Sequence, residues 1–572
     1  MIMIIIAKKM EHIKKLNLMM CLVCMSGYGF AQSDKSLDGG QVNVVQDYKP
    51  TLSDAIKINI NPTIVDSTPP TPEIKYSNIN KGFSPEFKVD PIKPAKMKGE
   101  PLQKLDNNYA RAGFGNYNTS LIEAHVGSGR SKKMNYAFSG KHFSSAGTID
   151  KHGYAGFAQN MLHAGASFFI PDHVLNVKGQ YHNSSIHYYG YDRDTNDVRP
   201  VFSKSENRQV YDLIDFNASL LQNTKNDEAL YHEFNVGFYN YHDKLKNQEN
   251  SFNMVAAIGK PIGKEIYGGR ILFNYYGNQS SPDSSQGAIL TFNPFVKTSG
   301  NKWHARLGIN VAVETDEGKT HFLPDISGKY NIVEGILSVY ADIKGYTYRN
   351  SYRKLSEENP FILPYINFRS TTVKIDASGG LRGNIDQHLY FNLNASYKII
   401  DSMALYVNKN FMQDNWQNAF TVIYENINIG RFYGEIGYVT ENKITVATWG
   451  AFNQYTMDKQ LKPWQLPILE GGVKASYNLG DKIIAGIDVF YMGTRYARIM
   501  KTERISPQTY IFKAAERKLK DYVDASLNFE YRYTKSLAGF IRLNNLASTP
   551  YNIWNNYPSQ RFNGMLGINV SF

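Results

Sequence analysis

The chain has 572 residues, a formal net charge of +12 at pH 7 and a mean hydropathy of -0.41. No stretch approaches the run of about 20 apolar residues that a membrane-spanning helix needs, which excludes a helical membrane protein. Aromatic residues are abundant, with 40 Tyr and 31 Phe. Tyr is favoured in strands and at the interfaces of membrane barrels, so the composition predicts an all-β chain, either a soluble protein or a barrel.

Residues 1–31 are predicted to be a secretory signal peptide. A positive region with Lys8, Lys9, Lys14 and Lys15 precedes a mostly apolar stretch at 16–30, which is too short to span a membrane. Small residues allow cleavage after Ala31. We therefore expect an exported protein.

The signal peptide contains both cysteines, Cys21 and Cys24, so the mature chain has no thiol for a disulfide, a metal site or catalysis. Its four Lys and one Glu carry +3, which leaves 12 − 3 = +9 on the mature chain. This charge predicts attraction to anionic groups such as lipopolysaccharide phosphates, or simply a solvated surface. No nucleic-acid-binding module is visible. The sequence leaves both Met1 and Met10 open as the true start.

Residues 32–108 form a proline-rich segment. Nine of the 22 prolines lie between Pro50 and Pro101. Proline at this density blocks helices and central strands, so the segment is predicted to be extended. It either lines the interior of a barrel or binds a periplasmic partner.

Residues 109–572 alternate apolar and polar positions, and side chains of a strand alternate between its two faces. One face of the stretch 303–314 is apolar and the other is mostly polar or small. The apolar face carries Trp303, Ala305, Leu307, Ile309, Val311 and Val313, and the other carries His304, Arg306, Gly308, Asn310, Ala312 and Glu314. A water-filled lumen accepts such charged residues, whereas the core of a β-sandwich does not.

The predicted fold is an all-β, transmembrane antiparallel β-barrel with about 22 strands, and with 18–20 as the alternative. Short turn signals, among them residues 299–301, 316–318, 441–442, 480–481 and 534–536, are predicted to face the periplasm. Longer polar segments are predicted to be external loops. They are residues 192–208, 350–360, 457–467 and 502–518.

The last strand carries Leu566, Ile568, Val570 and Phe572 on one face. A terminal strand needs a partner for its open edge, and a closed barrel supplies one. We expect it to pair with a first strand near residues 109–117. The terminal Phe572 is also the usual ending of outer-membrane barrels, which predicts recognition by the barrel-assembly machinery.

The C-terminal motifs resemble those of TonB-dependent-receptor barrels of Bacteroidetes. The matching stretches are 521–533, the Arg-Leu-Asn-Asn-Leu run at 542–546, a Tyr-x-x-Trp segment at 551–554, and the ending at 567–572. The resemblance implies an outer-membrane protein that transports or binds a solute at the cell surface. Tyr551, Trp554 and Tyr557 are predicted to be interfacial aromatic anchors.

The N-terminal part departs from that family, because no globular plug pattern precedes the first strand. Val44 and Val45 loosely resemble a TonB box, which implies TonB as a partner. The runs at 47–55 and 113–117 resemble a plug-less subset of Bacteroidetes proteins. A barrel without a plug must be filled by the 32–108 segment, by inward-folded loops or by a partner.

No catalytic or cofactor motif is recognisable, so we expect neither an enzyme nor a cofactor. The acidic loop at 192–197 matches only the start of a calcium loop. The aromatic run at 188–191 suits either sugar stacking or an aromatic girdle. Besides a solute receptor in the outer membrane, the alternative function is a structural or assembly subunit of an outer-membrane complex, with residues 32–108 as its docking arm.

Overall fold

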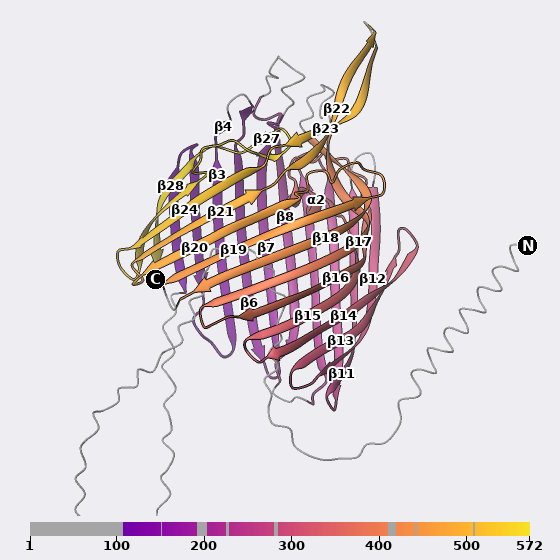
Figure 1. Cartoon of the computed structure of the whole chain (residues 1–572). Helices are drawn as coiled ribbons and strands as arrows, with labels where there is room; N and C mark the ends of the chain where they lie inside the picture. The colour runs from indigo at the N-terminus through magenta and orange to yellow at the C-terminus, as the bar shows by residue number, and fades with distance from the viewer. Residues whose placement is uncertain are drawn as a thin grey trace, which may run out of the picture. The chain divides into compact units, whose positions relative to one another are not determined.

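The computed structural model describes residues 107–149, 152–190, 203–224, 228–279, 284–409, 419–440, 443–506 and 509–572. The chain divides into two units, 1–62 and 63–572, and all described residues belong to the second. This second unit contains a single antiparallel sheet of 22 strands that closes into a barrel (Figure 1). The predicted fold class and strand number are therefore confirmed. No helix in the described part of the chain is long and apolar enough to cross a membrane.

Twenty-two strands of 8 to 21 residues form the barrel wall in chain order. They are β1 (Asn108–Gly115), β2 (Thr119–Gly127), β3 (Met134–Ser145), β6 (Phe157–Ile170), β7 (His173–His187), β8 (Arg208–Gln222), β9 (Tyr231–Asp243), β10 (Gln248–Ile262), β11 (Glu265–Gln279), β12 (Ser284–Ser299), β13 (Trp303–Glu314), β14 (Lys319–Val333), β15 (Leu337–Arg349), β16 (Ser370–Asn384), β17 (Leu389–Lys409), β18 (Ala419–Val439), β19 (Ile444–Met457), β20 (Leu469–Leu479), β21 (Ile483–Met492), β24 (Tyr522–Arg532), β25 (Leu537–Asn544) and β28 (Asn563–Ser571).

Smaller elements lie in the connections between barrel strands. They are β4 (Thr148–Ile149) with β5 (Gly153–Tyr154), α2 (Tyr352–Glu358), β22 (Arg495–Ser506) with β23 (Thr509–Leu519), and β26 (Asn552–Trp554) with β27 (Tyr557–Pro558). The β22–β23 hairpin projects beyond the barrel wall (Figure 1). Within the predicted loop at 502–518, residues 502–506 and 509–518 thus belong to a two-stranded ribbon.

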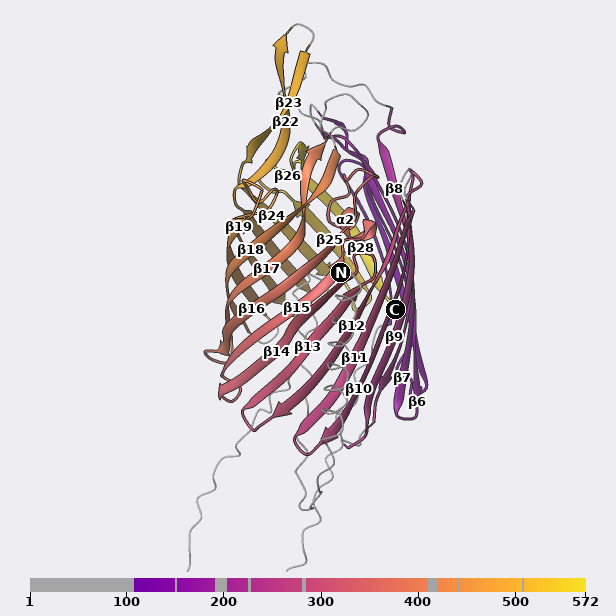
Figure 2. The same cartoon turned by 90° about the vertical axis from the view of Figure 1, so that its right-hand side faces the viewer.

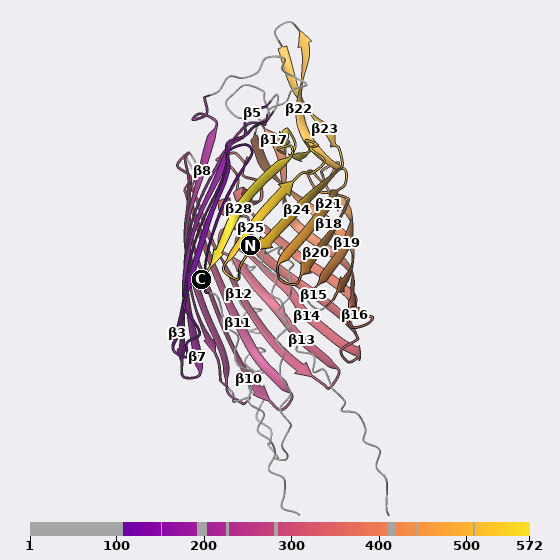
Figure 3. The same cartoon turned by 90° about the vertical axis from the view of Figure 1, so that its left-hand side faces the viewer.

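The barrel closes between its first and last strands, as the sequence predicts. β1 pairs antiparallel with β28, and the backbone N–H of Phe572 donates to the carbonyl of Asn108 at 3.0 Å. Figure 3 shows β28 beside the first strands of the chain. At this seam the ring of Phe540 occupies the space that a Cβ on Gly567 would need. Glycine is therefore required there for close approach.

The two faces of the wall differ as the alternation predicts. Apolar side chains of the predicted outer face are exposed, among them Leu307 at 56%, Leu566 at 69% and Ile568 at 55%. The inward-facing Ala312 and Glu314 on β13 are buried. An exposed apolar belt around a polar interior is the pattern of a barrel that crosses the outer membrane many times.

The two ends of the barrel have different connections. We call the end that carries Asn108 and Phe572 the terminal end and the opposite one the loop end. Short turns join strands at the terminal end, and the long connections lie at the loop end, which faces the cell exterior in such barrels. The predicted periplasmic turn at 316–318 is an exception. It follows β13 and lies at the loop end, because the strand before it runs away from the terminal end.

Candidate functional site

A segment at the loop end folds into the barrel instead of extending outward. It comprises residues 350–369 between β15 and β16, and we call it the cap. Figure 2 shows its helix α2 within the mouth of the barrel. The side chain of Ser351 accepts a hydrogen bond from the N–H of Lys354, which caps the helix. Pro360, which follows the last helical turn and its C-cap Asn359, cannot continue a helix.

Two carboxyl groups of the wall hold the start of α2. Glu249 of β10, 1% exposed, accepts the N–H of Tyr352 at 2.6 Å and that of Arg353 at 3.4 Å. Asp243 of β9 accepts the hydroxyl of Tyr352 at 2.6 Å. Burial raises the pKa of Tyr352 well above its usual range, so this hydroxyl remains a donor.

Tyrosines of the wall, together with Tyr188 just beyond β7, surround the cap and bond to it through their hydroxyls. Three of them donate to backbone carbonyls of the cap. The pairs are Tyr188 with Ile362 at 2.7 Å, Tyr211 with Pro360 at 2.7 Å and Tyr406 with Leu355 at 3.1 Å. Tyr241 bonds to the hydroxyl of Ser356 at 2.6 Å. Inside the barrel the backbone carbonyls of the cap lose their bonds to water, and these tyrosine hydroxyls replace those bonds.

An apolar cluster completes the closure of the mouth. It combines cap residues with the inner faces of β8, β9, β17 and β18. Its buried members are Tyr211, Leu213, Tyr239, Tyr241, Tyr352, Leu355, Ile362, Ile366, Tyr406, Phe420, Val422 and Tyr557. The backbone of the cap also pairs with β18, because the N–H of Leu363 donates to the carbonyl of Phe420 at 2.7 Å. The cap is therefore packed like a protein core.

A second inward loop, residues 545–562 between β25 and β28, seals the cap. Its Tyr557 stacks on Phe361 of the cap with ring centroids 3.7 Å apart. Tyr189 donates to the carbonyl of Pro558 at 3.0 Å. Arg495 donates to the carbonyl of Ile553 at 2.6 Å. The two loops thus form one plug at the loop end.

The lumen away from the cap is lined by polar side chains and ion pairs. Arg306 pairs with Asp325 at 2.9 Å, and Arg431 pairs with Glu470 at 2.8 Å. The half-buried ring of Trp449 stacks with Tyr433 at 6.3 Å. The inner wall of the described strands is therefore polar at these positions.

No family model matches the chain, and no curated protein is significantly similar to it in sequence. Solved structures do match. The siderophore receptor PirA from Acinetobacter baumannii gives a TM-score of 0.61 at 9% identity, covering 81% of this chain and 80% of that one. The FrpB iron transporter from Neisseria meningitidis gives 0.60 at 11% identity, covering 81% of each chain. The ferripyoverdine receptor of the outer membrane of Pseudomonas aeruginosa gives 0.58 at 12%, covering 81% and 71%.

The fold is shared with these receptors. At such low identity the likeness establishes the architecture, a 22-stranded outer-membrane barrel, and carries no residue roles. The share of this chain that matches corresponds in size to the barrel region.

The predicted aromatic anchors lie inside the loop end, not on the lipid-facing surface. Tyr557 has no exposed surface, and a side chain buried in this way cannot lie at a membrane interface. Trp554 packs edge-on against Tyr406 and Phe420. Tyr551 donates to Asp524 at 2.7 Å. Their aromatic character serves the packing of the plug.

Other predicted site residues have simpler positions. Phe572 is 65% exposed at the terminal end. Val44 and Val45, the acidic loop at 192–197 and the 32–106 segment lie outside the described residues. In the part that the structure describes, no three potential metal ligands come together. Tyr188 and Tyr189 pack against the plug from the inside and do not form an outer girdle.

Sequence reasoning missed the two carboxyl groups that hold α2. Glu249 and Asp243 occupy inward positions of alternating strands and look like ordinary lumen residues. A local signal for the helix was present, since Ser351 precedes the Tyr-Arg-Lys-Leu-Ser-Glu-Glu run and Asn359-Pro360 follows it. This signal predicts a helix and not its partners.

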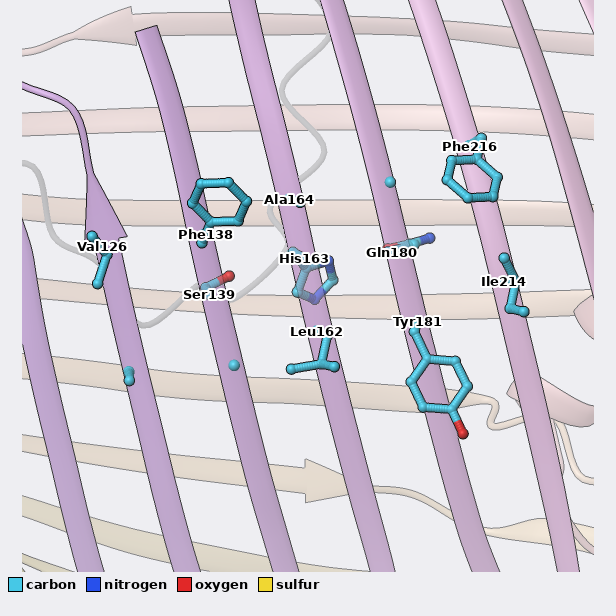
Figure 4. A pocket seen from close by; sticks show the side chains of 13 residues that line it. Val126, Phe138, Ser139, Leu162, His163, Ala164, Gln180, Tyr181, Ile214 and Phe216 are labelled. Atoms are coloured by element: carbon cyan, nitrogen blue, oxygen red, sulfur yellow. The ribbon is translucent and has the colours of Figure 1, made fainter.

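A shallow apolar groove lies on the outer face of the barrel wall (Figure 4). It runs over β2, β3, β6, β7 and β8, has a volume of about 670 Å³, and is lined by Phe138, Leu162 and Phe216 among others. These side chains belong to the exposed apolar belt. The groove therefore faces lipid and is not a solute site.

Proposed function

We propose that the protein is an outer-membrane receptor of the TonB-dependent type that binds or transports a solute at the cell surface, with the cap as its gate. The observation that carries this proposal is a wide polar lumen whose loop end is closed by an inward-folded segment with its own helix. Solved structures of the same fold are named as a siderophore receptor and an iron transporter. We assign the solute no class narrower than hydrophilic.

We further propose that this chain, of a Bacteroidetes type, works without a globular plug in its barrel. The cap and the 545–562 loop then take over the closure of the mouth. Residues 32–108 would contact the periplasmic machinery, and Val44 and Val45 are the candidate contact with TonB. Phe572 would serve as the signal for the barrel-assembly machinery, and lipopolysaccharide would surround the loop end.

The same closure supports a second candidate, a structural subunit of an outer-membrane complex. A barrel that only anchors partner proteins needs no open passage, and a mouth that is packed like a protein core fits that role. In that case residues 32–108 are the docking arm and the mature protein never opens.

Conductance in planar bilayers separates the two candidates. Asn350 and Arg369 are already paired, with the N–H of Asn350 donating to the carbonyl of Arg369 at 3.1 Å. Replacing residues 351–368 by a two-residue Asn-Gly turn therefore removes the cap without stretching β15 or β16. Removal of residues 502–512 from the projecting hairpin is the control.

A gated transporter predicts brief openings of the wild type and a large steady conductance without the cap. The hairpin deletion should behave like the wild type. Silence of both the wild type and the cap deletion, with the barrel still heat-modifiable on a gel, rejects the gate. Loss of a stoichiometric partner on deletion of residues 32–100 would then favour the structural subunit.

A further inference from the structure

Two histidines face each other at the terminal end of the barrel. His173 begins β7 and His232 lies near the start of β9, with Gln222 of β8 in the same row between them. His173 shares its face of β7 with the exposed Val177, and His232 shares its face of β9 with the exposed Phe234. Both rings therefore lie on the outer surface, at the rim near the periplasm.

The surroundings of the two rings favour one tautomer. Nδ1 of His173 lies 3.1 Å from the carbonyl of Pro171, and Nδ1 of His232 lies 3.1 Å from the carbonyl of Leu230. A carbonyl oxygen only accepts, so both contacts are hydrogen bonds when each Nδ1 carries the hydrogen. Each neutral ring is left with a lone pair on Nε2.

These two lone pairs point at each other. The Nε2 atoms are 2.8 Å apart, and the ring centroids are 5.0 Å apart. With Nδ1 protonated on both rings, two neutral acceptors at that distance repel, and a cation between them removes the repulsion. Either a proton or a metal ion can be that cation.

The surroundings favour a metal. Histidines that bind metals almost always donate their other ring N–H to a carbonyl, a carboxylate or water, and both of these rings do so. Zinc binds imidazole nitrogen at about 2.0–2.1 Å, so tetrahedral ligands lie about 3.3 Å apart, and the pair needs to open by about 0.5 Å. Such a change is within the reach of a small rotation of two half-exposed rings.

We propose that His173 and His232 form a binding site for a borderline transition-metal ion such as Zn²⁺. The described residues bring no third histidine, carboxylate or thiolate to this position, so water completes the coordination sphere. A site with two protein ligands at the aqueous rim exchanges its metal readily. When occupied, it ties β7 to β9 across β8. The site is independent of the cap and of the proposed gating.

The test measures binding of Zn²⁺ alone to the purified full chain in detergent, without a polyhistidine tag. The variants are His173→Gln and His232→Gln. His388→Gln is the matched control, because His388 is a half-buried histidine at the same end whose ring packs against Tyr438. Heat-modifiable migration on a gel confirms that each variant is folded.

The wild type and His388→Gln should each bind one zinc ion per barrel. His173→Gln and His232→Gln should each weaken that binding by about tenfold or more. The proposal is overturned if the wild type binds no stoichiometric zinc, or if the two variants bind it as tightly as the control does. The first of these results would leave a shared proton as the bridging cation.

Discussion

The barrel wall and the cap are both packed structures, but their contacts are distributed differently. Every wall strand is paired with two neighbours, and most of these neighbours follow or precede it in the order of wall strands along the chain. The cap is held by side chains from strands far away in the sequence, such as Glu249 and Tyr241, and by short backbone pairing with Phe420 of β18. We expect the loss of cap contacts to release the mouth while the wall remains folded. That separation is what a gate requires.

The substitution Gly567→Val should impair folding of the barrel wall more than any other change considered. A Cβ at Gly567 meets the carbonyl of Ala112 and the ring of Phe540, so the β1–β28 seam cannot close in register. We expect loss of the heat-modifiable species. Gly480→Asn is the control, because Gly480 has a φ of 57° with open space around it, and Asn tolerates that conformation. A normal yield of folded Gly567→Val would contradict the importance of the seam.

The cap should be released most strongly by Tyr557→Ala. Truncation of a buried aromatic side chain costs about 3–5 kcal/mol, which shifts an opening equilibrium by more than about a hundredfold. We expect frequent openings in planar bilayers with an intact barrel on gels. Tyr533→Ala is the control, because Tyr533 is 69% exposed. If both variants conduct alike, Tyr557 does not hold the cap.

Alternation along the chain was enough to predict the wall, its two faces and its seam. Each of those features depends on a period of two residues and on neighbouring strands. The cap follows another rule. Tyr352 and Glu249 are 103 residues apart, and nothing in either local sequence indicates their contact. Tyr557 illustrates the same limit, since an aromatic near a strand end fits an interface and a plug equally well.

Glu249→Ala should have an intermediate effect on the cap. It leaves the N–H of Tyr352 and the hydroxyl of Tyr239 without their acceptor, at a cost of about 1.5–3 kcal/mol. The cap then becomes accessible, and trypsin should cleave after Arg353 in the intact barrel. Glu249→Gln keeps one acceptor oxygen and should be cleaved more slowly. Equal protection of the wild type and Glu249→Ala would show that this carboxyl group does not hold α2.

Tyr241→Phe should have the smallest effect of the series. It removes one hydrogen bond, worth about 1 kcal/mol, to Ser356. The hydroxyl of Ser356 still donates to the carbonyl of Tyr352 at 2.7 Å, so no buried donor is left unpaired. The rate of trypsin cleavage should rise only a few-fold over the wild type, and Tyr267→Phe on the exposed outer face should leave it unchanged. A larger effect than that of Glu249→Ala would mean that the tyrosine hydroxyls, and not the carboxyl groups, keep the mouth closed.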